Sequence, residues 1–406
     1  METTATPGVL ENVGFDFVGY HDLGGNPGFK MAVQEHGGHW YLYVGHLWRR
    51  GWSVLEVTDP AAPRLIRTLE GPEGTWTIQV QAADGRLVCA LEKPGAGWGV
   101  PADAPFAEGI SVFDIAEDPC DPRPLGRWRT GATGTHRNFY AGGRYVFAAA
   151  SRPGYVGNLL VILDIADPTA PREVGMWAAP GQEEGHRAPR AYMHGPSDVR
   201  GERAYVSYGR YGAVVLDISD LTAPREIGHL DLGAFGSVLG CHSAQPIEGR
   251  DLLVVNSEAI RDGDGDALNY VVAVDIAEET RPRPLSMFPL PRPSAGLPYR
   301  SYYDKGGRFG PHNQHHFQNN PAHGCLREHV LLTYFNAGLR LFDLSDPREP
   351  HEIGCFVPED PRERRGPRPA TLVTQFEDVL VDARGVIYCT DKNHGLFLLR
   401  YPAGLR

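Results

Sequence analysis

The sequence predicts an all-β fold, in which residues 1–406 form a single seven-bladed β-propeller. One sequence motif recurs along the chain: an apolar run that ends in an acidic residue, a short proline-containing turn, and then a basic residue and another apolar stretch. Each copy also offers four short strand-like segments, and the two chain ends complement one another. The equivalent positions lie 50 to 68 residues apart, at Glu56, Asp114, Asp164, Asp217, Asp275, Asp343 and, in a decayed seventh copy, Arg400.

The third copy shows why each unit should form four antiparallel strands. An inner strand over residues 136–140 leads to a glycine turn at 142–143, and two apolar strands follow over 144–150 and 159–163. The pair Asp167-Pro168 then begins the turn into an outer strand over 173–177. Proline has a fixed φ and no N–H to donate, so it belongs at turns and sheet edges. No long segment with helical periodicity competes with these strands.

The chain ends predict how the ring closes. Residues 12–20 resemble an outer strand that follows no inner strands, and the last unit stops after its third strand, at Tyr401. We therefore expect the N-terminal strand to complete the C-terminal blade and to hide the edges of both. The expected blades cover roughly residues 21–70, 71–130, 131–178, 179–232, 233–290, 291–357, and 358–406 together with 10–20.

The run Leu-Val-Ile-Leu-Asp at residues 160–164, and its other copies, resemble the repeat of the LVIVD-repeat family of β-propellers. The resemblance covers nearly the whole chain and implies the propeller fold. It implies little about activity, because that family is defined by its repeats.

Composition limits the kinds of partner. A net charge of −11 offers no basic surface for nucleic acid or for an anionic membrane, and no apolar run approaches 18 residues. The first residues lack the basic and apolar regions of a signal peptide. The six cysteines are scattered without paired spacing, which favours reduced thiols and a cytoplasmic protein. Oligomeric state is left open.

Several histidines fall at the same position of successive blades. Counting back seven residues from the turn glycines Gly143, Gly201 and Gly249 leads to His136, His194 and His242. The same count from Gly385 leads to Asp378, whereas the first two blades have Met31 and Ile78 there. In the sixth blade the turn is longer, and His315 or His316 is the expected equivalent, with His312 as a further alternative on the same strand face as His316.

Equivalent inner-strand positions surround the axis of a propeller, so these imidazoles should converge on one point. Clustered imidazoles near a carboxylate suit a divalent transition metal, with iron or copper favoured and manganese or zinc as alternatives. The arrangement is similar to that of propeller-fold carotenoid-cleaving oxygenases, of the selenium-binding protein group and of pectic-oligosaccharide lyases. No motif matches them residue by residue, so no catalytic residue is transferred.

Candidate catalytic residues follow from the same arrangement. Arg137 and Asp378 lie on or beside the histidine positions, and Tyr192 and Tyr303 lie in two long inserts, 181–193 and 289–311, that should form a lid. These inserts also contain several arginines, including Arg187 and Arg190. Aromatic and guanidinium groups around a metal favour a small aromatic or anionic substrate.

Three functions remain open from the sequence. The first is a non-haem iron or copper oxidoreductase that acts on a small organic molecule. The second is a manganese- or zinc-dependent lyase or hydrolase, in which a nearby Tyr or His acts as base. The third is a non-catalytic interaction platform, because propellers commonly bind proteins on their faces. Convergence of the histidine nitrogens on one point would favour the enzymes.

Overall fold

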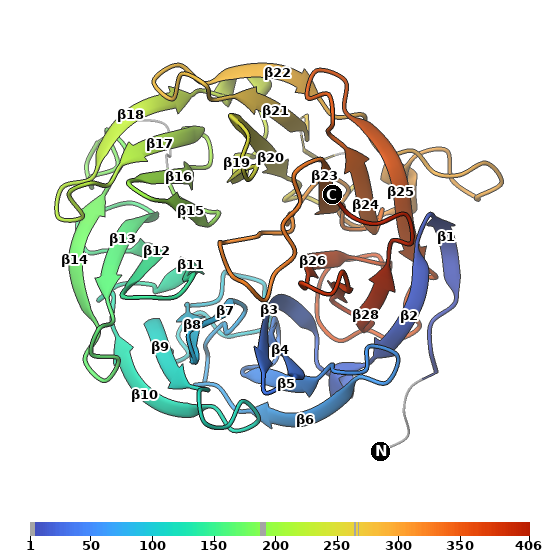
Figure 1. Ribbon diagram of the computed structural model, residues 1–406, viewed down its shortest axis with the longest axis horizontal. Helices are drawn as coiled ribbons and strands as arrows, with labels where there is room; N and C mark the ends of the chain where they lie inside the picture. Colours follow the sequence, from blue (N-terminus) through green and yellow to red (C-terminus); the bar gives the residue numbers. More distant parts are fainter. Residues whose placement is uncertain (1–4, 187–191, 264, 267) are drawn as a thin grey trace.

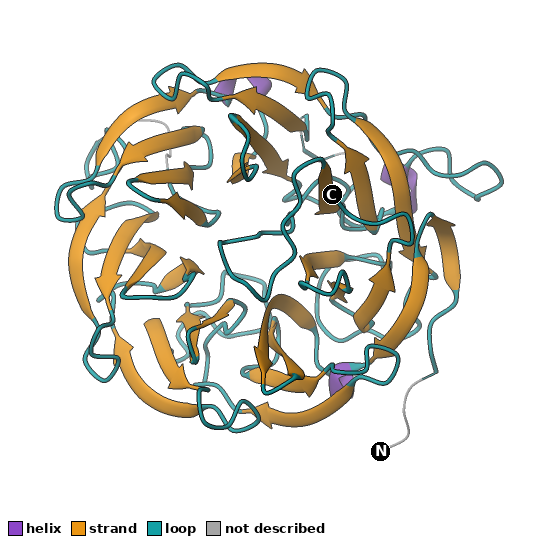
Figure 2. Ribbon diagram, viewed as in Figure 1, coloured by secondary structure: helices purple, strands orange, loops and turns teal. Residues whose placement is uncertain are grey.

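The strands of the protein form seven four-stranded antiparallel sheets arranged in a ring, as seen in the computed structural model (Figure 1). The structure describes residues 5–186, 192–263, 265–266 and 268–406. Besides strands, these residues form α1 (Tyr302–Lys305) and two short 3₁₀ turns, η1 (Leu23–Gly25) and η2 (Gly233–Phe235) (Figure 2). None of the helices in the described ranges is long and apolar enough to cross a membrane. The predicted fold class is confirmed.

The blades follow one another along the chain, and each of the first five is built from four consecutive strands. Their strands are β3 (Gly28–His36), β4 (His39–His46), β5 (Trp52–Glu56) and β6 (Arg64–Leu69); β7 (Val80–Ala83), β8 (Arg86–Leu91), β9 (Gly109–Asp114) and β10 (Arg123–Trp128); β11 (Thr135–Phe139), β12 (Tyr145–Ser151), β13 (Asn158–Asp164) and β14 (Arg172–Trp177); β15 (Ser197–Arg200), β16 (Arg203–Ser207), β17 (Ala213–Asp217) and β18 (Arg225–Leu230); and β19 (Leu239–Pro246), β20 (Leu252–Glu258), β21 (Val271–Asp275) and β22 (Arg283–Met287).

The acidic residue of the repeat forms an ion pair that links the third strand of a blade to its outer strand. Asp164 ends β13, and its carboxylate lies 2.5 Å from Arg172 at the start of β14. The same pairing recurs eight residues apart in the next two blades, at Asp217 with Arg225 (2.7 Å) and Asp275 with Arg283 (2.5 Å). The recurring motif of the sequence therefore forms a turn that an ion pair stabilises.

Two N-terminal strands, rather than one, close the ring. The last two blades are β23 (His329–Thr333), β24 (Leu339–Asp343) and β25 (His351–Pro358), and β26 (Phe376–Val381), β27 (Ile387–Asp391) and β28 (Gly395–Arg400). Strand β2 (Asp16–His21) pairs with β28 and completes the seventh blade, as predicted. Strand β1 (Val9–Val13) pairs instead with β25 and adds an outermost strand to the sixth blade.

The sixth blade has no regular inner strand, and the chain at that position continues across the axis. His312 and His315 still donate backbone N–H bonds to Thr333 and Leu331, in the manner of an inner strand. The following residues, 316–324, cross the centre of the ring and are visible in orange in Figure 1. They are anchored by Asn320 Nδ2, which donates to the Ala82 carbonyl of blade two (2.8 Å), and by Ala383 of blade seven, whose N–H donates to Ala322. We call residues 316–324 the axial plug.

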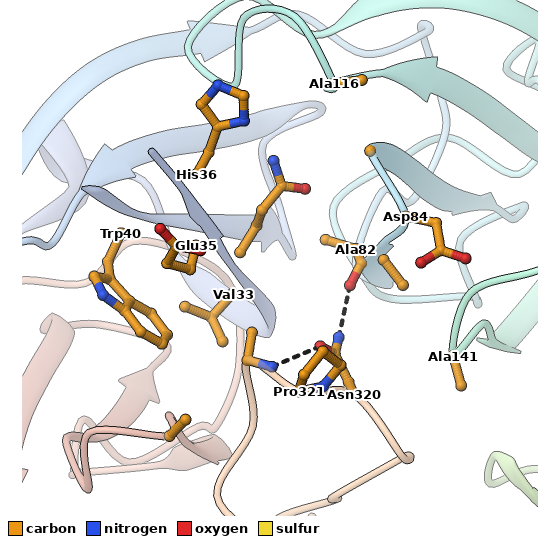
Figure 3. Close-up of a pocket in the computed structure, with 15 residues that line it drawn as sticks. Val33, Glu35, His36, Trp40, Ala82, Asp84, Ala116, Ala141, Asn320 and Pro321 are labelled. Atoms are coloured by element: carbon orange, nitrogen blue, oxygen red, sulfur yellow. Dashed lines mark hydrogen bonds between the residues drawn. The ribbon is translucent and has the colours of Figure 1, made fainter. Parts of the chain in front are cut away.

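A cavity of about 510 Å³ lies on the outer side of the axial plug (Figure 3). Its walls come from the ends of the first inner strands and their turns, including Glu35, His36 and Asp84, and its floor includes Asn320. The bond from Asn320 to Ala82 crosses this floor. The plug therefore separates this cavity from the opposite end of the axis, where the inner strands begin.

Candidate metal centre

Four imidazoles from consecutive blades line one side of the axis, at the end opposite the axial plug. His136 lies in β11, His194 just before β15, His242 in β19, and His312 in the inner segment of blade six. Neighbouring ring centroids are 4.3, 5.4 and 4.8 Å apart along this series. The structure thus brings together His136, His194 and His242, and of the three alternatives for the sixth blade it is His312 that joins them.

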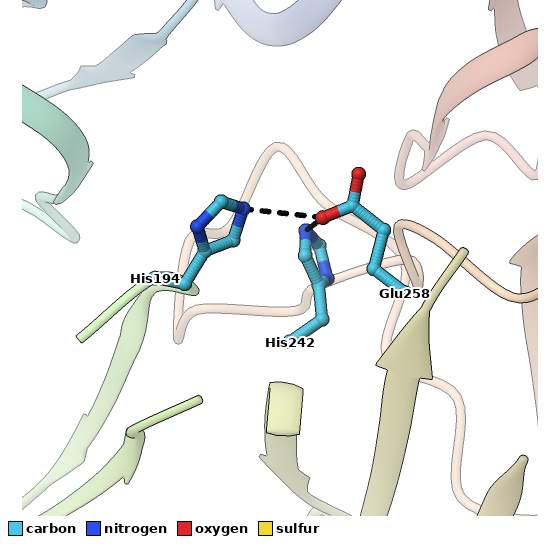
Figure 4. A group of neighbouring side chains, drawn as sticks. All are labelled: His194, His242 and Glu258. Carbon is cyan, nitrogen blue, oxygen red and sulfur yellow. Dashed lines mark ion pairs between the residues drawn. The ribbon is translucent and has the colours of Figure 1, made fainter. Parts of the chain in front are cut away.

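The Nε2 atoms of His194 and His242 meet the carboxylate of Glu258, which ends β20 (Figure 4). Glu258 Oε2 lies 3.1 Å from His194 Nε2 and 3.6 Å from His242 Nε2. His194 Nε2 lies 3.3 Å from His136 Nε2. Two atoms that each lie about 2.1 Å from one ion stand about 3.0–3.4 Å apart at octahedral to tetrahedral angles. The spacing of these nitrogens and oxygens therefore suits a shared divalent ion.

The other ring nitrogens have partners that orient the imidazoles. His136 Nδ1 lies 2.7 Å from Glu92 Oε2, and His242 Nδ1 lies 2.9 Å from the Ser243 hydroxyl. His312 Nδ1 lies 3.4 Å from the amide nitrogen of Asn313, and Glu377 Oε2 lies 3.3 Å away without a hydrogen bond. In His136 and His242, a proton held on Nδ1 by its acceptor leaves the lone pair on Nε2, and metal-binding histidines are commonly oriented in this way.

The electrostatic environment keeps the candidate ligands in the forms that bind a metal. Burial, together with the neighbouring His136, lowers the pKa of His194 to about 4. Burial and the adjacent Arg137 hold the pKa of His242 well below its usual value. Burial would raise the pKa of Glu258, but the surrounding imidazoles outweigh this effect and keep that pKa well below the usual value. At neutral pH the site thus offers neutral imidazoles and a carboxylate.

Arg137, which the sequence placed among the catalytic candidates, touches the arc directly. It is buried, and its guanidinium lies 2.7 Å from His242 Nε2 and donates to Asn313 Oδ1, also at 2.7 Å. A metal ion ligated by His242 Nε2 would displace the first of these bonds and free one guanidinium N–H. Asn313 would keep the side chain beside the site.

Solvent reaches the site between blades two and four. The side chains of Glu92, His136 and His194 are 14%, 12% and 19% exposed, whereas His242 is fully buried. Tyr192, another candidate, lies at this opening, and its ring centroid is 6.1 Å from that of His194. Arg187 and Arg190 of the same insert lie outside the described residues.

Comparisons with known proteins agree with the repeat and the fold. The family model described as the LVIVD repeat matches residues 153–178 and 198–231, which contain β13–β14 and β15–β18. This match and the ring of seven sheets support an LVIVD-repeat β-propeller. A comparison of the LVIVD-repeat propeller with curated proteins found no match.

A solved structure shares the architecture of the LVIVD-repeat propeller at low sequence identity. The periplasmic gluconolactonase of Pseudomonas aeruginosa is 12% identical, with a TM-score of 0.58 over 89% of this chain and 99% of that one. BamB from Moraxella catarrhalis is 11% identical, with a TM-score of 0.47 over 92% and 84% of the two chains. At such identities the likeness to the gluconolactonase supports the fold alone.

Two of the predicted metal ligands lie elsewhere in the LVIVD-repeat propeller. His315 Nε2 lies 2.7 Å from the Gly324 carbonyl and its Nδ1 accepts from the Val381 N–H, so both ring nitrogens are occupied. His316 begins the axial plug, where its Nδ1 lies 3.2 Å from Gln318 Nε2. The count from the turn does not carry over to blade six, because its inner segment leads into the plug instead of a glycine turn.

Two catalytic candidates are also engaged away from the arc. Asp378 accepts from Lys30 Nζ (2.7 Å) and from the Met31 backbone N–H (2.9 Å), so it joins blade seven to blade one. Tyr303 lies in α1, where its ring packs edge-on against Phe309 with centroids 4.8 Å apart. In the described residues, both side chains serve packing between elements rather than the histidine arc.

Sequence reasoning missed two carboxylates of the site, Glu258 and Glu92, although a signal for both was present. Glu258 ends β20, and Glu92 directly follows β8, and both are second strands of apolar sequence. A second strand runs antiparallel to the inner strand and ends at the face where the inner strand begins. An acidic residue at the end of a second strand therefore lies at the same end of the axis as the histidines.

Separate replacement of His312 and His316 by alanine tests the assignment of His312 to the metal site. We expect His312→Ala to weaken binding of a divalent metal by about 10- to 100-fold, because His312 Nε2 lies 3.7 Å from Glu258 Oε1 and orients that carboxylate. His316→Ala should leave the affinity unchanged, and it is the matched control because both residues are buried. Competition with a chromophoric chelator measures both, and equal losses in the two variants would contradict the assignment.

Proposed function

We propose that this protein is a metal-dependent enzyme for a small organic substrate, with non-haem iron bound on the propeller axis. The observation that carries the proposal is the convergence of His194 Nε2, His242 Nε2 and a Glu258 oxygen, atoms that all lie within 4.8 Å of one another. His136 adjoins this group through His194.

The set of donor atoms favours iron among the metals considered. Two histidines and one carboxylate with open coordination positions are typical of non-haem iron oxygenases. Copper, which a purely imidazole site would also suit, is less favoured by a carboxylate ligand. Manganese and zinc accept the same donors, so a lyase or hydrolase is the second candidate, in which Tyr192 beside His194 would act as the base.

The residues around the ion have separable roles. A bound ion would supply redox chemistry or Lewis acidity. Glu92 holds the His136 ring in place at the opening, where substrate would arrive. Arg137, once displaced from His242 Nε2, presents a guanidinium N–H to a substrate oxygen while Asn313 holds it. His242 and Glu258 lie on the buried side of the site, away from bulk water.

A non-catalytic interaction platform explains this cluster less well. Four adjacent imidazoles and a buried carboxylate are costly to desolvate, and Glu258 Oε2 contacts only imidazole nitrogens, at 3.1 Å from His194 and 3.6 Å from His242. Hydrophobic side chains would fill the same space at lower cost if the propeller only presented its outer faces.

Metal competition tests the proposal. Metal-free protein is dialysed against equal concentrations of Fe²⁺, Mn²⁺ and Zn²⁺ without oxygen, and bound metal is then measured by elemental analysis. Iron retention, followed by oxygen uptake when candidate substrates are added, is the expected result. Retention of manganese or zinc without oxygen uptake would favour the lyase or hydrolase instead. Retention of none would leave a binding propeller.

A further inference from the structure

An aromatic wall faces the histidine arc across the axis. Blades one and two contribute Trp48, Trp76 and Trp98 to one apolar cluster with Phe29, Leu47 and Ile78. The Trp98 ring lies edge-on to Trp76, with centroids 5.2 Å apart, and is stacked at 6.3 Å on Trp48. We call these three indoles the tryptophan wall.

The apolar cluster that contains the tryptophan wall adjoins both ends of the histidine arc. On one side, Trp76 and Glu92 exchange backbone hydrogen bonds of 2.8 and 3.2 Å, and Glu92 in turn contacts His136. On the other side, Phe29 of the same cluster lies edge-on to His312, with centroids 5.8 Å apart. Histidines and indoles therefore form the two halves of one ring around the axis.

A buried lysine bridges the two halves. Lys392 Nζ lies 5.4 Å from the ring centroid of Trp98 and 5.7 Å from that of Phe335. Phe335 stacks on His312 with centroids 4.6 Å apart, and Lys392 also forms a 2.7 Å ion pair with Glu377. The tryptophan wall is thus joined to the candidate metal centre by a cation in aromatic surroundings.

Several N–H donors at this end of the axis are buried without a partner among the described residues. They are the indole N–H groups of Trp48 and Trp76 and the Nε of Arg137. Buried donors are normally satisfied, so this set indicates a ligand or water that carries hydrogen-bond acceptors. Tryptophan can only donate, which favours an oxygen-bearing ligand.

The charges around the axis favour an anion. Four carboxylates face four cations at this end of the ring: Glu92, Glu258, Glu377 and Asp378, with Lys30, Arg137, Arg308 and Lys392. These eight groups balance one another, and a divalent ion would add two positive charges to them. Uncompensated charge is costly in a buried site, and an anionic substrate would offset it.

Taken together, the geometry points to a small aromatic carboxylate as the substrate, and this inference rests on the proposed function. Its ring packs against the tryptophan wall, and its carboxylate meets the metal and the unpartnered N–H donors. The indoles supply the apolar surface that a planar ring needs, and the cations supply the attraction for the acid group.

Binding of benzoate to the metal-loaded protein tests the inference, with quenching of intrinsic tryptophan fluorescence and calorimetry as readouts. Cyclohexanecarboxylate, which has the charge without the aromatic ring, and phenol, which has the ring without the carboxylate, are the comparison ligands. Trp98→Leu is the test variant because Trp98 lies in a partly exposed loop. Trp40→Leu is the matched control, since Trp40 is partly buried and lies beside the cavity on the far side of the plug.

We expect benzoate to bind more tightly than either comparison ligand, and Trp98→Leu to weaken it about tenfold with unchanged metal content. Trp40→Leu should bind like the wild type. Equal binding of benzoate and cyclohexanecarboxylate, or equal affinity in Trp98→Leu and wild type, would overturn the inference while leaving the metal centre intact. If no metal binds, the proposed function fails, and the same titration still decides whether the tryptophan wall holds an aromatic acid.

Discussion

Replacing Glu258 by glutamine is expected to lower the affinity for a divalent metal at least about 100-fold while the propeller stays folded. The change removes the negative charge shared by His194 and His242 but keeps the shape of the side chain. The amide oxygen can still accept from Arg308 NH1, which now lies 2.9 Å from Glu258 Oε1. The loss should therefore be one of metal binding, with stability lowered by only about 1–3 kcal/mol.

Calorimetric titration and thermal unfolding separate these two effects. Glu352→Gln is a suitable control, because Glu352 is a partly buried carboxylate that is also paired with an arginine (Arg340, 3.1 Å) but lies on the outer strand β25. That variant should bind metal like the wild type. Unchanged affinity in Glu258→Gln would show that this carboxylate is not a ligand.

Removing residues 1–21 is expected to abolish the cooperative unfolding transition, whereas removing residues 1–13 should leave a folded protein. The longer deletion takes away β2 and exposes the edge of β28, so the seventh blade loses its outer strand and the ring opens. It also removes Tyr20, whose ring packs on Phe397 with centroids 5.3 Å apart.

The shorter deletion removes only β1, which is additional to the sixth blade. Its main loss is Glu11, a buried carboxylate that accepts from the Tyr302 hydroxyl, and we expect a cost of about 1–3 kcal/mol. Scanning calorimetry and size-exclusion chromatography distinguish the two proteins. A folded, monomeric protein without residues 1–21 would contradict the account of ring closure.

The fold could be predicted because its signals are local and repeated. The acidic residue, the proline turn and the following arginine recur in each blade, and in the structure they form one ion-paired turn, as in Asp164 with Arg172. The pairing of β1 with β25 could not be predicted in this way. The pairing joins segments more than 300 residues apart, and residues 9–13 carry no copy of the repeat motif that would mark them as a strand.

The candidate site could be predicted only where blades share one register. His136, His194 and His242 lie at or near the start of a regular inner strand that ends in a glycine turn. Counting back seven residues from each turn therefore finds all three. In blade six the axial plug replaces the turn. Alignment on the turn therefore favoured His315 or His316 over His312. Asp378 holds the shared position but turns to Lys30, a buried cation that the register does not reveal. Glu258 was missed because it lies on a second strand, outside the column of residues compared.

The most direct test of the central claim is the metal content of untagged protein, measured by elemental analysis beside a His194→Ala/His242→Ala variant. The axial site predicts about one equivalent of a transition metal in the wild type, and its loss in a variant that keeps the wild-type circular dichroism spectrum. Wild-type protein that holds no metal, even after reconstitution, would contradict the metal centre, as would a double variant that keeps its full metal content.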